Sequence, residues 1–522
     1  MIALPVIIPM AAAAMCLMLW SKARPQAFIA IVSSTITLAV SVAMLDVART
    51  GQIQVVHFGS WVAPFGISFA ADILSAIMVT LCSIVGLCVV VFSVGAIDRL
   101  RAGNGMYPLS LCLIAAVNGA FLTADIFNLY VWFELMLLSS FVLLTLGGQR
   151  GQLEGAIKYV TLNLVSSLLF LIAVGLIYGT IGTLNMADLA VKLDAHPDPA
   201  LPTALSALLL IAFAIKAAAF PFFFWLPASY HTPPPVVSAL FAGLLTKVGV
   251  YALIRAVTLL FDQEWEVVGQ VTLIIAGFTM VTGVLGAVVQ SDMRRILSFH
   301  IVSQIGYMLM GLGIAITALA AVDNADEASA RAVAVLALAG SVFYILHHIL
   351  VKTNLFLIAG AIYEQRGTTE LARVNGLLAS RPFLASLFMI SALSLAGIPV
   401  LSGFWAKLIL VRSGLEAQSY MIVIVSLCVS ILTLYSMTKI WISAFWGEPD
   451  PVDRLDPSSC PRSRQFCLIV PIIALCICTT VIGIFAEPFS ALAVQAAEQL
   501  LSPDAYINAV LDGARSLSEA AP

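Results

Sequence analysis

Long apolar runs recur along almost the whole of this 522-residue chain, and they constrain its fold more than any other feature. Each run is about 20 residues long, the length at which an α-helix crosses ~30 Å of hydrocarbon. Only 10% of the residues are charged, whereas a soluble domain carries about 25%. The sequence therefore predicts an all-α polytopic membrane protein with about fourteen transmembrane helices. The predicted spans are residues 2–20, 27–47, 72–95, 107–123, 126–146, 155–180, 203–226, 236–260, 267–289, 296–320, 332–362, 383–411, 420–446 and 466–486.

The composition also excludes several classes of function. A formal net charge of −3 excludes a nucleic-acid-binding protein that works by bulk positive charge. The nine cysteines form no CxxC pair and have no histidines at zinc spacing, so we expect no metal site. The sequence has no nucleotide, flavin or iron–sulfur motif, and we expect no cofactor. Residues 1–19 lack the positive start of a signal peptide, because Lys22 and Arg24 follow the apolar run, and they are expected to form the first span.

The distribution of lysine and arginine among the loops predicts the orientation. If the first loop is cytoplasmic, the loops on that side carry 13 of the 25 Lys and Arg residues, the opposite side carries 6, and 6 lysines lie within spans. Positively charged loops stay in the cytoplasm. The protein is therefore expected in the cell (inner) membrane, with both termini on the outer side. The tail after Phe485 mixes apolar and polar residues and is expected to form a helix at the membrane surface.

Two spans are interrupted by proline and glycine at corresponding places in two halves of the chain. Pro221 interrupts span 7 and Pro399 interrupts span 12, and the segment LFLIA occurs at both 169–173 and 355–359. These correspondences predict two five-helix repeats, the second inverted relative to the first because each holds an odd number of helices. Broken helices are tolerated at membrane depth only where they face protein or water. The predicted divisions are 1–106 (three N-terminal helices), 107–260 (first repeat, spans 4–8), 261–446 (inverted second repeat, spans 9–13) and 447–522 (a cytoplasmic loop, span 14 and the C-terminal helix).

A carboxylate lies in the middle of span 5. Glu134 is the ninth residue of the span 126–146, and apolar residues flank it on both sides. A charge at the centre of a bilayer costs roughly 2.5–3.5 kcal/mol on insertion scales, so an uncompensated one suggests a function. Glu134 is therefore predicted to carry a proton or to pair with a lysine. The alternative is a protonated glutamate bonded to a backbone carbonyl of a neighbouring helix.

Two lysines lie in the middle of neighbouring spans. Lys216 and Lys247 each have at least ten largely apolar residues on either side. A buried lysine changes its proton affinity when a carboxylate partner moves away or is protonated, which is what a proton relay needs. Pro221 loosens the helix close to Lys216. The alternative is a static ion pair between Lys216 and Glu134 that only fixes helix register.

Three further lysines lie closer to span ends. Lys407 follows the break at Gly397–Gly403 by four residues, and it either faces the interior or extends to the membrane surface. Lys439 corresponds to Lys247 in the second repeat but lies toward the cytoplasmic end of its span. It could therefore belong to the interior relay or extend to the membrane surface, and both possibilities stay open. Lys158 begins its helix on the cytoplasmic side and is expected to extend to the surface.

Histidines and a lysine are concentrated in spans 10 and 11. His348 and Lys352 are four residues apart and share a helix face, so they can pass a proton between them. His300 and His347 extend this polar row, and the four residues are predicted to form a relay. Axial haem ligation is the alternative, but the adjacent His347 and His348 point about 100° apart on a helix, whereas haem needs two facing ligands.

Five segments around these charges carry a resemblance to a known family. They are NLYVWFELMLLSSFVLL from Asn128, PASYHTPPPVVSAL from Pro227, GLLTKVGVYAL around Lys247, SFHIVSQIGYMLMG from Ser298 and LSGFWAKLIL around Lys407. They resemble the proton-translocating antiporter-like membrane proteins. This family includes the large subunits of Mrp (Mnh or Pha) cation/proton antiporters and three subunits of respiratory complex I.

The resemblance implies fourteen helices, inverted halves and a role for each buried charge. Glu134 and Lys216 would form a switching pair, and Lys247 would be the central relay. Lys407 would end the exit half-channel, and it argues against the one complex I homologue that has a glutamate at this place. The residues implied to continue the relay between them are His300, His347, His348 and Lys352.

We therefore expect a subunit of a secondary cation/proton antiporter, not an enzyme. Its expected partners are the other subunits of an Mrp-type complex (A, B, C, E, F and G), protons, Na⁺ or else K⁺ or Li⁺, and membrane lipid. The alternative is a proton-pumping subunit of complex I (NADH-quinone oxidoreductase), which has nearly the same residues. An inert scaffold is disfavoured by the cost of so many intramembrane charges. Asp46, Asp72 and Asp125 lie near span ends and could bind the cation, but terminal aspartates are more often solvated caps, so none is assigned.

Overall fold

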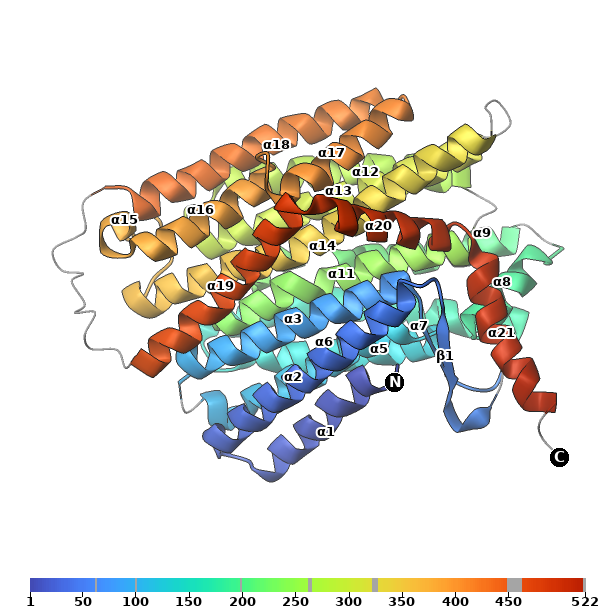
Figure 1. Ribbon diagram of the computed structural model, residues 1–522, viewed down its shortest axis with the longest axis horizontal. Coiled ribbons are helices and arrows are strands. Elements are labelled where there is room, and N and C mark those ends of the chain that lie inside the picture. The colour runs from blue at the N-terminus through green and yellow to red at the C-terminus, as the bar shows by residue number, and fades with distance from the viewer. Residues whose placement is uncertain are drawn as a thin grey trace.

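The structure, a computed structural model, is a bundle of helices that run roughly along one long axis (Figure 1). It describes residues 1–61, 63–98, 101–197, 200–261, 265–321, 327–447 and 462–519. Twelve helices in this part of the chain are long and apolar enough to cross a membrane. Two shorter apolar helices, Leu4–Met18 and Pro382–Ala396, lie in the first and twelfth predicted spans. The multi-pass helical fold is thus confirmed, whereas the count of fourteen is not.

The helices follow the predicted spans, with several short additions. The N-terminal part contains α1 (Leu4–Met18), α2 (Ala23–Ala48), β1 (Gln54–His57), η1 (Phe58–Ser60), β2 (Ser68–Ala71), α3 (Ile73–Ala96), η2 (Ala102–Met106), α5 (Tyr107–Leu122), α6 (Ile126–Thr145), α7 (Arg150–Ile181), α8 (Met186–Asp194), α9 (Ala200–Ala217), α10 (Trp225–Ser229) and α11 (Pro235–Leu259). The C-terminal part contains α12 (Trp265–Val289), α13 (Met293–Ala320), α14 (Glu327–Arg366), α15 (Leu377–Ser380), α16 (Pro382–Ala396), α17 (Ser402–Glu416), α18 (Tyr420–Ile440), η4 (Trp441–Phe445), α19 (Arg462–Ile484), α20 (Ala486–Leu500) and α21 (Pro503–Glu519).

Both predicted helix breaks are present. α9 ends at Ala217, and Ala218 has a positive φ of 58° before the chain reaches Pro221, which has no backbone N–H to continue the helix. α16 ends at Ala396, where Gly397 adopts φ 90°, a conformation that glycine reaches without steric strain. Each break leaves backbone carbonyls without their helical partners. The broken helices expected at spans 7 and 12 are therefore confirmed.

A two-stranded hairpin, which the all-α prediction missed, lies at one end of the bundle. β1 pairs with β2 in antiparallel register, and the N–H of Ala124 donates to the Ser68 carbonyl at 2.9 Å. Each strand is only four residues long, so neither strand is found by a search for apolar runs of membrane length. α8 and α21 lie at the same end (Figure 1), and we call this end, defined by β1, β2, α8 and α21, the hairpin end.

The C-terminal tail forms two helices instead of the single surface helix expected. α20 packs on α14 and α3, and the Gln499 side chain accepts a hydrogen bond from the N–H of Ile73 at 2.9 Å. α21 then turns across the hairpin end and contacts α8 and β1 (Figure 1). Most of the predicted loop after 447 lies outside the described residues, which resume at 462.

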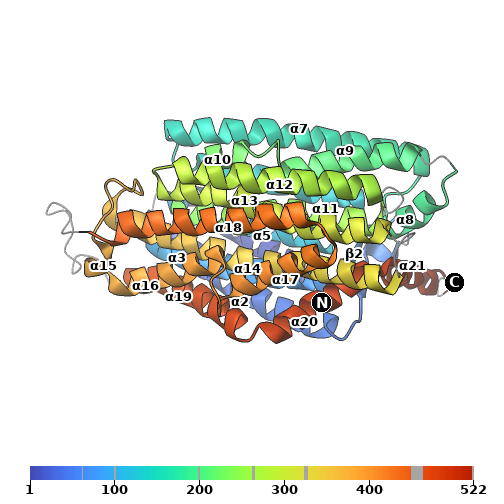
Figure 2. The ribbon, with the colours of Figure 1, turned by 90° about the horizontal axis from the view of Figure 1, so that it is seen from above.

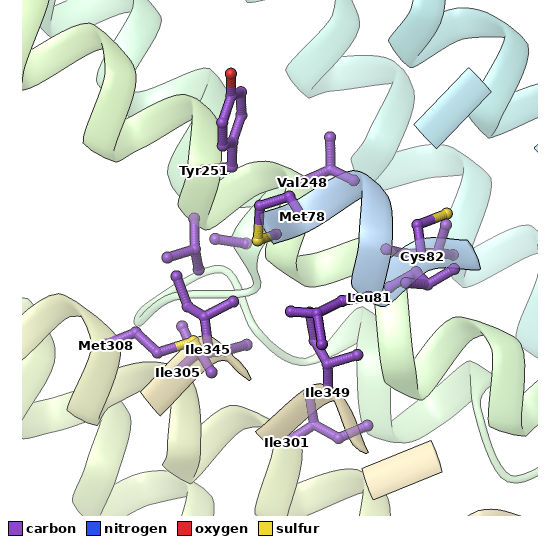
Figure 3. Packing of buried hydrophobic residues seen from close by; sticks show 14 of the residues in the cluster. Met78, Leu81, Cys82, Val248, Tyr251, Ile301, Ile305, Met308, Ile345 and Ile349 are labelled. Atoms are coloured by element: carbon purple, nitrogen blue, oxygen red, sulfur yellow. The ribbon is translucent and has the colours of Figure 1, made fainter. Parts of the chain in front are cut away.

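The core lies where α3, α11, α13 and α14 meet. Met78 of α3 lies next to Val248 of α11, and Leu81 of α3 lies next to Ile349, with Ile305 in the same cluster (Figure 3). Every residue of α11 is buried, while α7 lies at one edge of the bundle with α19 and α20 at the opposite edge (Figure 2). A charged residue in α11 is therefore enclosed by protein on all sides.

Candidate functional site

Lys216 lies at the first helix break. It is the last residue but one of α9, and only 3% of it is exposed. Its ammonium donates to the Ser167 hydroxyl of α7 at 3.3 Å and stands 5.6 Å from the centroid of the Phe133 ring. Among the described residues no ion pair joins it to Glu134, although the charge of Glu134 is close enough to act on it. The static ion pair considered from the sequence is thus not formed here.

Glu134 lies on a side of α6 that this chain only partly covers. Val131, one turn before it, is 42% exposed, and Leu138, one turn after it, is 61% exposed. The Glu134 Oε1 atom is buried and has no hydrogen-bond partner among the described residues. Among the described residues Glu134 therefore has no hydrogen bond to a backbone carbonyl and no ion pair with a lysine.

Lys247 lies in the middle of α11 and is completely buried. Its ammonium donates to the Ala242 carbonyl of the same helix. Two residues later, Gly249 lets α11 approach α9 very closely, since a Cβ there would lie 2.5 Å from the Ala217 backbone nitrogen. This contact places the helix of Lys247 directly against the break that carries Lys216.

Adding one methyl group at Gly249 is expected to destabilise the protein. In Gly249→Ala the new Cβ meets backbone, so the helices must separate, and overpacking of this kind costs about 1–3 kcal/mol. The matched control is Gly175→Ala in α7, where nothing lies within 4 Å and the better helix propensity of alanine has no clash to offset it. The unfolding temperature in detergent should fall only in Gly249→Ala. An equal response of the two variants would contradict the close approach.

The predicted polar row of the second half is fully buried. His300 Nε2 lies 2.5 Å from the Ser436 hydroxyl, and His347 Nδ1 lies 2.8 Å from the Ser402 hydroxyl at the start of α17. The Lys352 ammonium donates to the Leu297 carbonyl at 3.2 Å. Neither ring nitrogen of His348 has a partner among the described residues. Buried nitrogens without a protein partner are the places where water binds, and water can extend such a row.

Lys407 lies at the second helix break. Its ammonium donates to the Ala396 carbonyl, the last residue of α16, at 2.9 Å and stands 5.2 Å from the Tyr307 ring centroid. It therefore points into the bundle, and the alternative of an extension to the membrane surface is wrong. Lys439 instead binds the carbonyls of Val288 and Gln290 at the end of α12.

Lys158 is exposed, and its extension to the membrane surface stays a prediction. It pairs with Glu154 on an exposed part of α7, with its ammonium 2.6 Å from the carboxylate. This places it outside the interior row.

A buried ion pair at the hairpin end was not predicted from the sequence. Arg255 of α11 pairs with Asp72, which caps α3 by accepting from the N–H of Ser75 at 2.8 Å. Their side chains are 7% and 2% exposed. Asp72 is therefore not a solvated cap, and neither is Asp125, which caps α6 and whose pKa burial raises to about 6. The only sequence signal was that both aspartates stand directly before an apolar run.

Metal binding by a cluster of side chains finds no support in the described residues. There, no three His, Cys, Asp or Glu side chains come together as metal ligands would. His300 and His347 are each engaged with a serine of another helix. The geometry brings together amines, imidazoles and hydroxyls along the interior, which suits proton transfer better than metal ligation.

Comparisons with known proteins bear on the family and the fold of this chain. The transmembrane family NADH:quinone oxidoreductase/Mrp antiporter matches residues 123–324 and 329–433. The chain is 45% identical to the D-type subunit of the Na⁺/H⁺ antiporter of Alkalihalophilus pseudofirmus, over 90% of each chain. It is 34% identical to a chain of the Mrp complex of a Dietzia species, with a TM-score of 0.87 over 98% of this chain and 99% of that chain. A chain of respiratory complex I from Thermus thermophilus shares the fold at 22% identity, with a TM-score of 0.78 over 96% and 100%.

Proposed function

The chain belongs to the NADH:quinone oxidoreductase/Mrp antiporter family of transmembrane proteins, and we propose that it translocates protons as a subunit of a multisubunit Na⁺/H⁺ antiporter. The observation that carries the proposal is the set of buried amines and imidazoles that connects the two helix breaks. Lys216 stands at the first break and Lys407 at the second. The buried Lys247 and Lys352 belong to α11 and α14, which pack on each other and on the helices α9 and α17 that carry the other two lysines. Intramembrane charges of this kind are the usual mark of an ion or proton path.

The relay works by changing the partner of Lys216. With Glu134 ionised and close, the charged ammonium is stabilised; with Glu134 protonated or turned away, Lys216 keeps only the neutral Ser167 hydroxyl. A proton then moves inward to Lys247, on to His348 and Lys352, past His300 and His347, and leaves through Lys407. Each member therefore needs a second arrangement besides the one described here. Because the two repeats, 107–260 and 261–446, are inverted relative to each other, each half-channel would open to a different side of the membrane.

We place the hairpin end outside a cell membrane, with both termini on that side. This orientation puts most of the loop lysines and arginines in the cytoplasm. The other subunits of the complex and the cation, Na⁺ with K⁺ or Li⁺ as alternatives, complete the proposal. A transporter subunit of this kind carries out no chemical conversion of its own.

The test uses everted vesicles that contain the whole complex, with a pH-sensitive dye. After respiration has built a proton gradient, Na⁺, K⁺ or Li⁺ is added, and recovery of dye fluorescence reports exchange. Recovery that needs this chain supports the antiporter. No response to any cation, together with co-purification of NADH-quinone oxidoreductase activity, would favour a complex I subunit, whose antiporter-like chain has the same fold.

Lys407→Ala is expected to abolish this exchange, whereas Lys439→Ala should retain it. Lys407 contacts the break through the Ala396 carbonyl, while Lys439 only caps the end of α12. Loss of a side chain that transfers protons typically lowers a rate by about 10²-fold or more. Both variants should assemble to similar levels in the membrane. Equal exchange in the two variants would remove Lys407 from the path.

A further inference from the structure

A small cavity lies between the hairpin end and Lys216. Its volume is about 10 Å³, close to the minimum that holds one water molecule. Arg255, Tyr251, Thr123 and Phe213 are among the residues that line it. Of its lining residues in the described chain, only Arg255 is charged, and no carboxylate is present to bind a metal cation. The cavity therefore suits water and protons and not Na⁺.

The outer wall of the cavity is a buried polar cap. Arg255 pairs with Asp72, and its guanidinium lies 4.9 Å from the ring centroid of Tyr506, which α21 carries across this end of the bundle (Figure 1). The Tyr251 hydroxyl donates to the Phe121 carbonyl at 2.8 Å and points away from the apolar core (Figure 3). Each of these groups is held by contacts between different helices, so the cap opens if those helices move apart. Because each group is polar, water can then bind to it.

On its inner side the cavity is lined by Phe213, which belongs to an aromatic cluster. The Phe213 ring packs edge-on against Phe170, with centroids 5.0 Å apart, and against Phe133 at 5.9 Å. α9 runs inward from the hairpin end, so Lys216 lies one turn beyond Phe213, with its ammonium on the Phe133 ring. The three rings thus stand between the cavity and the lysine.

We propose that Phe213 is the gate of a route from the hairpin end to Lys216, which the Asp72–Arg255 pair and Tyr506 cap. An apolar constriction that expels water closes a path, and a ring rotation that admits water opens it. The gate keeps Lys216 from the hairpin side while the lysine is connected to the opposite end of the bundle, which prevents uncoupled proton flow. This inference rests on the proposed function, because it takes Lys216 as part of the proton path.

The first test is the proton leak of Phe213→Ala in vesicles without added Na⁺, K⁺ or Li⁺. Without the ring, water connects the cavity to Lys216, and a preformed pH gradient should collapse several-fold faster than in the unmodified complex. The matched control is Phe388→Ala in α16, a fully buried phenylalanine that stacks on Phe445 and does not line the cavity. Phe388→Ala removes the same side-chain volume as Phe213→Ala, and vesicles with this variant should show no increased proton leak. An assembled Phe213→Ala complex with an unchanged leak overturns the gate.

A second test does not depend on the stability of Phe213→Ala. Ala252 lines the cavity and is 1% exposed, so Ala252→Cys should react slowly with a membrane-impermeant thiol reagent added from the hairpin side. Adding Tyr506→Ala should raise that rate several-fold, with the complex lacking Ala252→Cys as the background for native cysteines. Equal rates with and without Tyr506 would overturn the cap.

The two levels of the proposal fail differently. If Lys216→Ala keeps full cation-driven exchange, the proposed function fails and the gate fails with it. If Lys216→Ala loses exchange while Phe213→Ala does not leak, the route alone is wrong. The leak of Phe213→Ala should also disappear in Phe213→Ala/Lys216→Ala, and a leak that persists would show that water bypasses the lysine.

Discussion

Glu134→Gln is expected to abolish cation-driven proton exchange while the complex still assembles. An amide has nearly the same shape as the carboxylate, but it can neither ionise nor carry a proton. Because Glu134 Oε1 has no hydrogen-bond partner among the described residues, the substitution breaks no contact that holds α6 in place. Removal of one proton-transferring group typically costs about 10²–10⁴ in rate, which in the vesicle assay is a complete loss of the fluorescence recovery.

The control for this prediction is a carboxylate that cannot belong to the relay. Asp46 lies at the end of α2, pairs with Arg49 on the surface and is 63% exposed. Exposed pairs of this kind contribute about 0–1 kcal/mol, so Asp46→Asn should leave both assembly and exchange unchanged. Normal exchange in a fully assembled Glu134→Gln complex would exclude Glu134 from the proton path.

The sequence identifies the interior charges because the cost of burying them is local. Glu134, Lys216 and Lys247 stand in apolar runs of membrane length, and no rearrangement of the fold takes them out of the bilayer. The two helix breaks are similarly local, since Pro221 and Gly397 act on their own helices. The two breaks were therefore predictable from the sequence, and the structure has them where expected, whereas the roles of the three charges stay a prediction.

Features that depend on contacts between distant segments were not predictable. The direction of the Lys407 side chain is set by Ala396 and Tyr307, and its place in the span fits an inward or an outward ammonium equally well. Arg255 and Asp72 are 183 residues apart, and each alone looks like a charge near the membrane surface. The hairpin depends on pairing between two segments that are each too short to stand out.

The ion pair at the hairpin end gives the largest expected effect on stability. In Asp72→Ala the Arg255 guanidinium stays buried without a counter-charge, and breaking a buried pair in this way costs about 3–5 kcal/mol. The Ser75 N–H also loses its cap, which adds about 0.5–2 kcal/mol. We expect a clear fall of the unfolding temperature in detergent and a lower yield of the assembled complex. Asp46→Ala, which breaks the exposed pair with Arg49, should have almost no effect.

Removing both charges separates the cost of the unpaired arginine from the rest. Replacing a buried pair by apolar side chains is often neutral or stabilising, so Asp72→Ala/Arg255→Leu should recover most of the lost stability. The helix cap is not restored in the double variant, and a remaining loss of about 0.5–2 kcal/mol is expected from it. If the double variant is as unstable as Asp72→Ala, the pair does not account for the loss, and the Asp72 side chain acts through the cap alone. If it recovers stability but its pH gradient collapses faster, the same two residues both stabilise the hairpin end and close it to water.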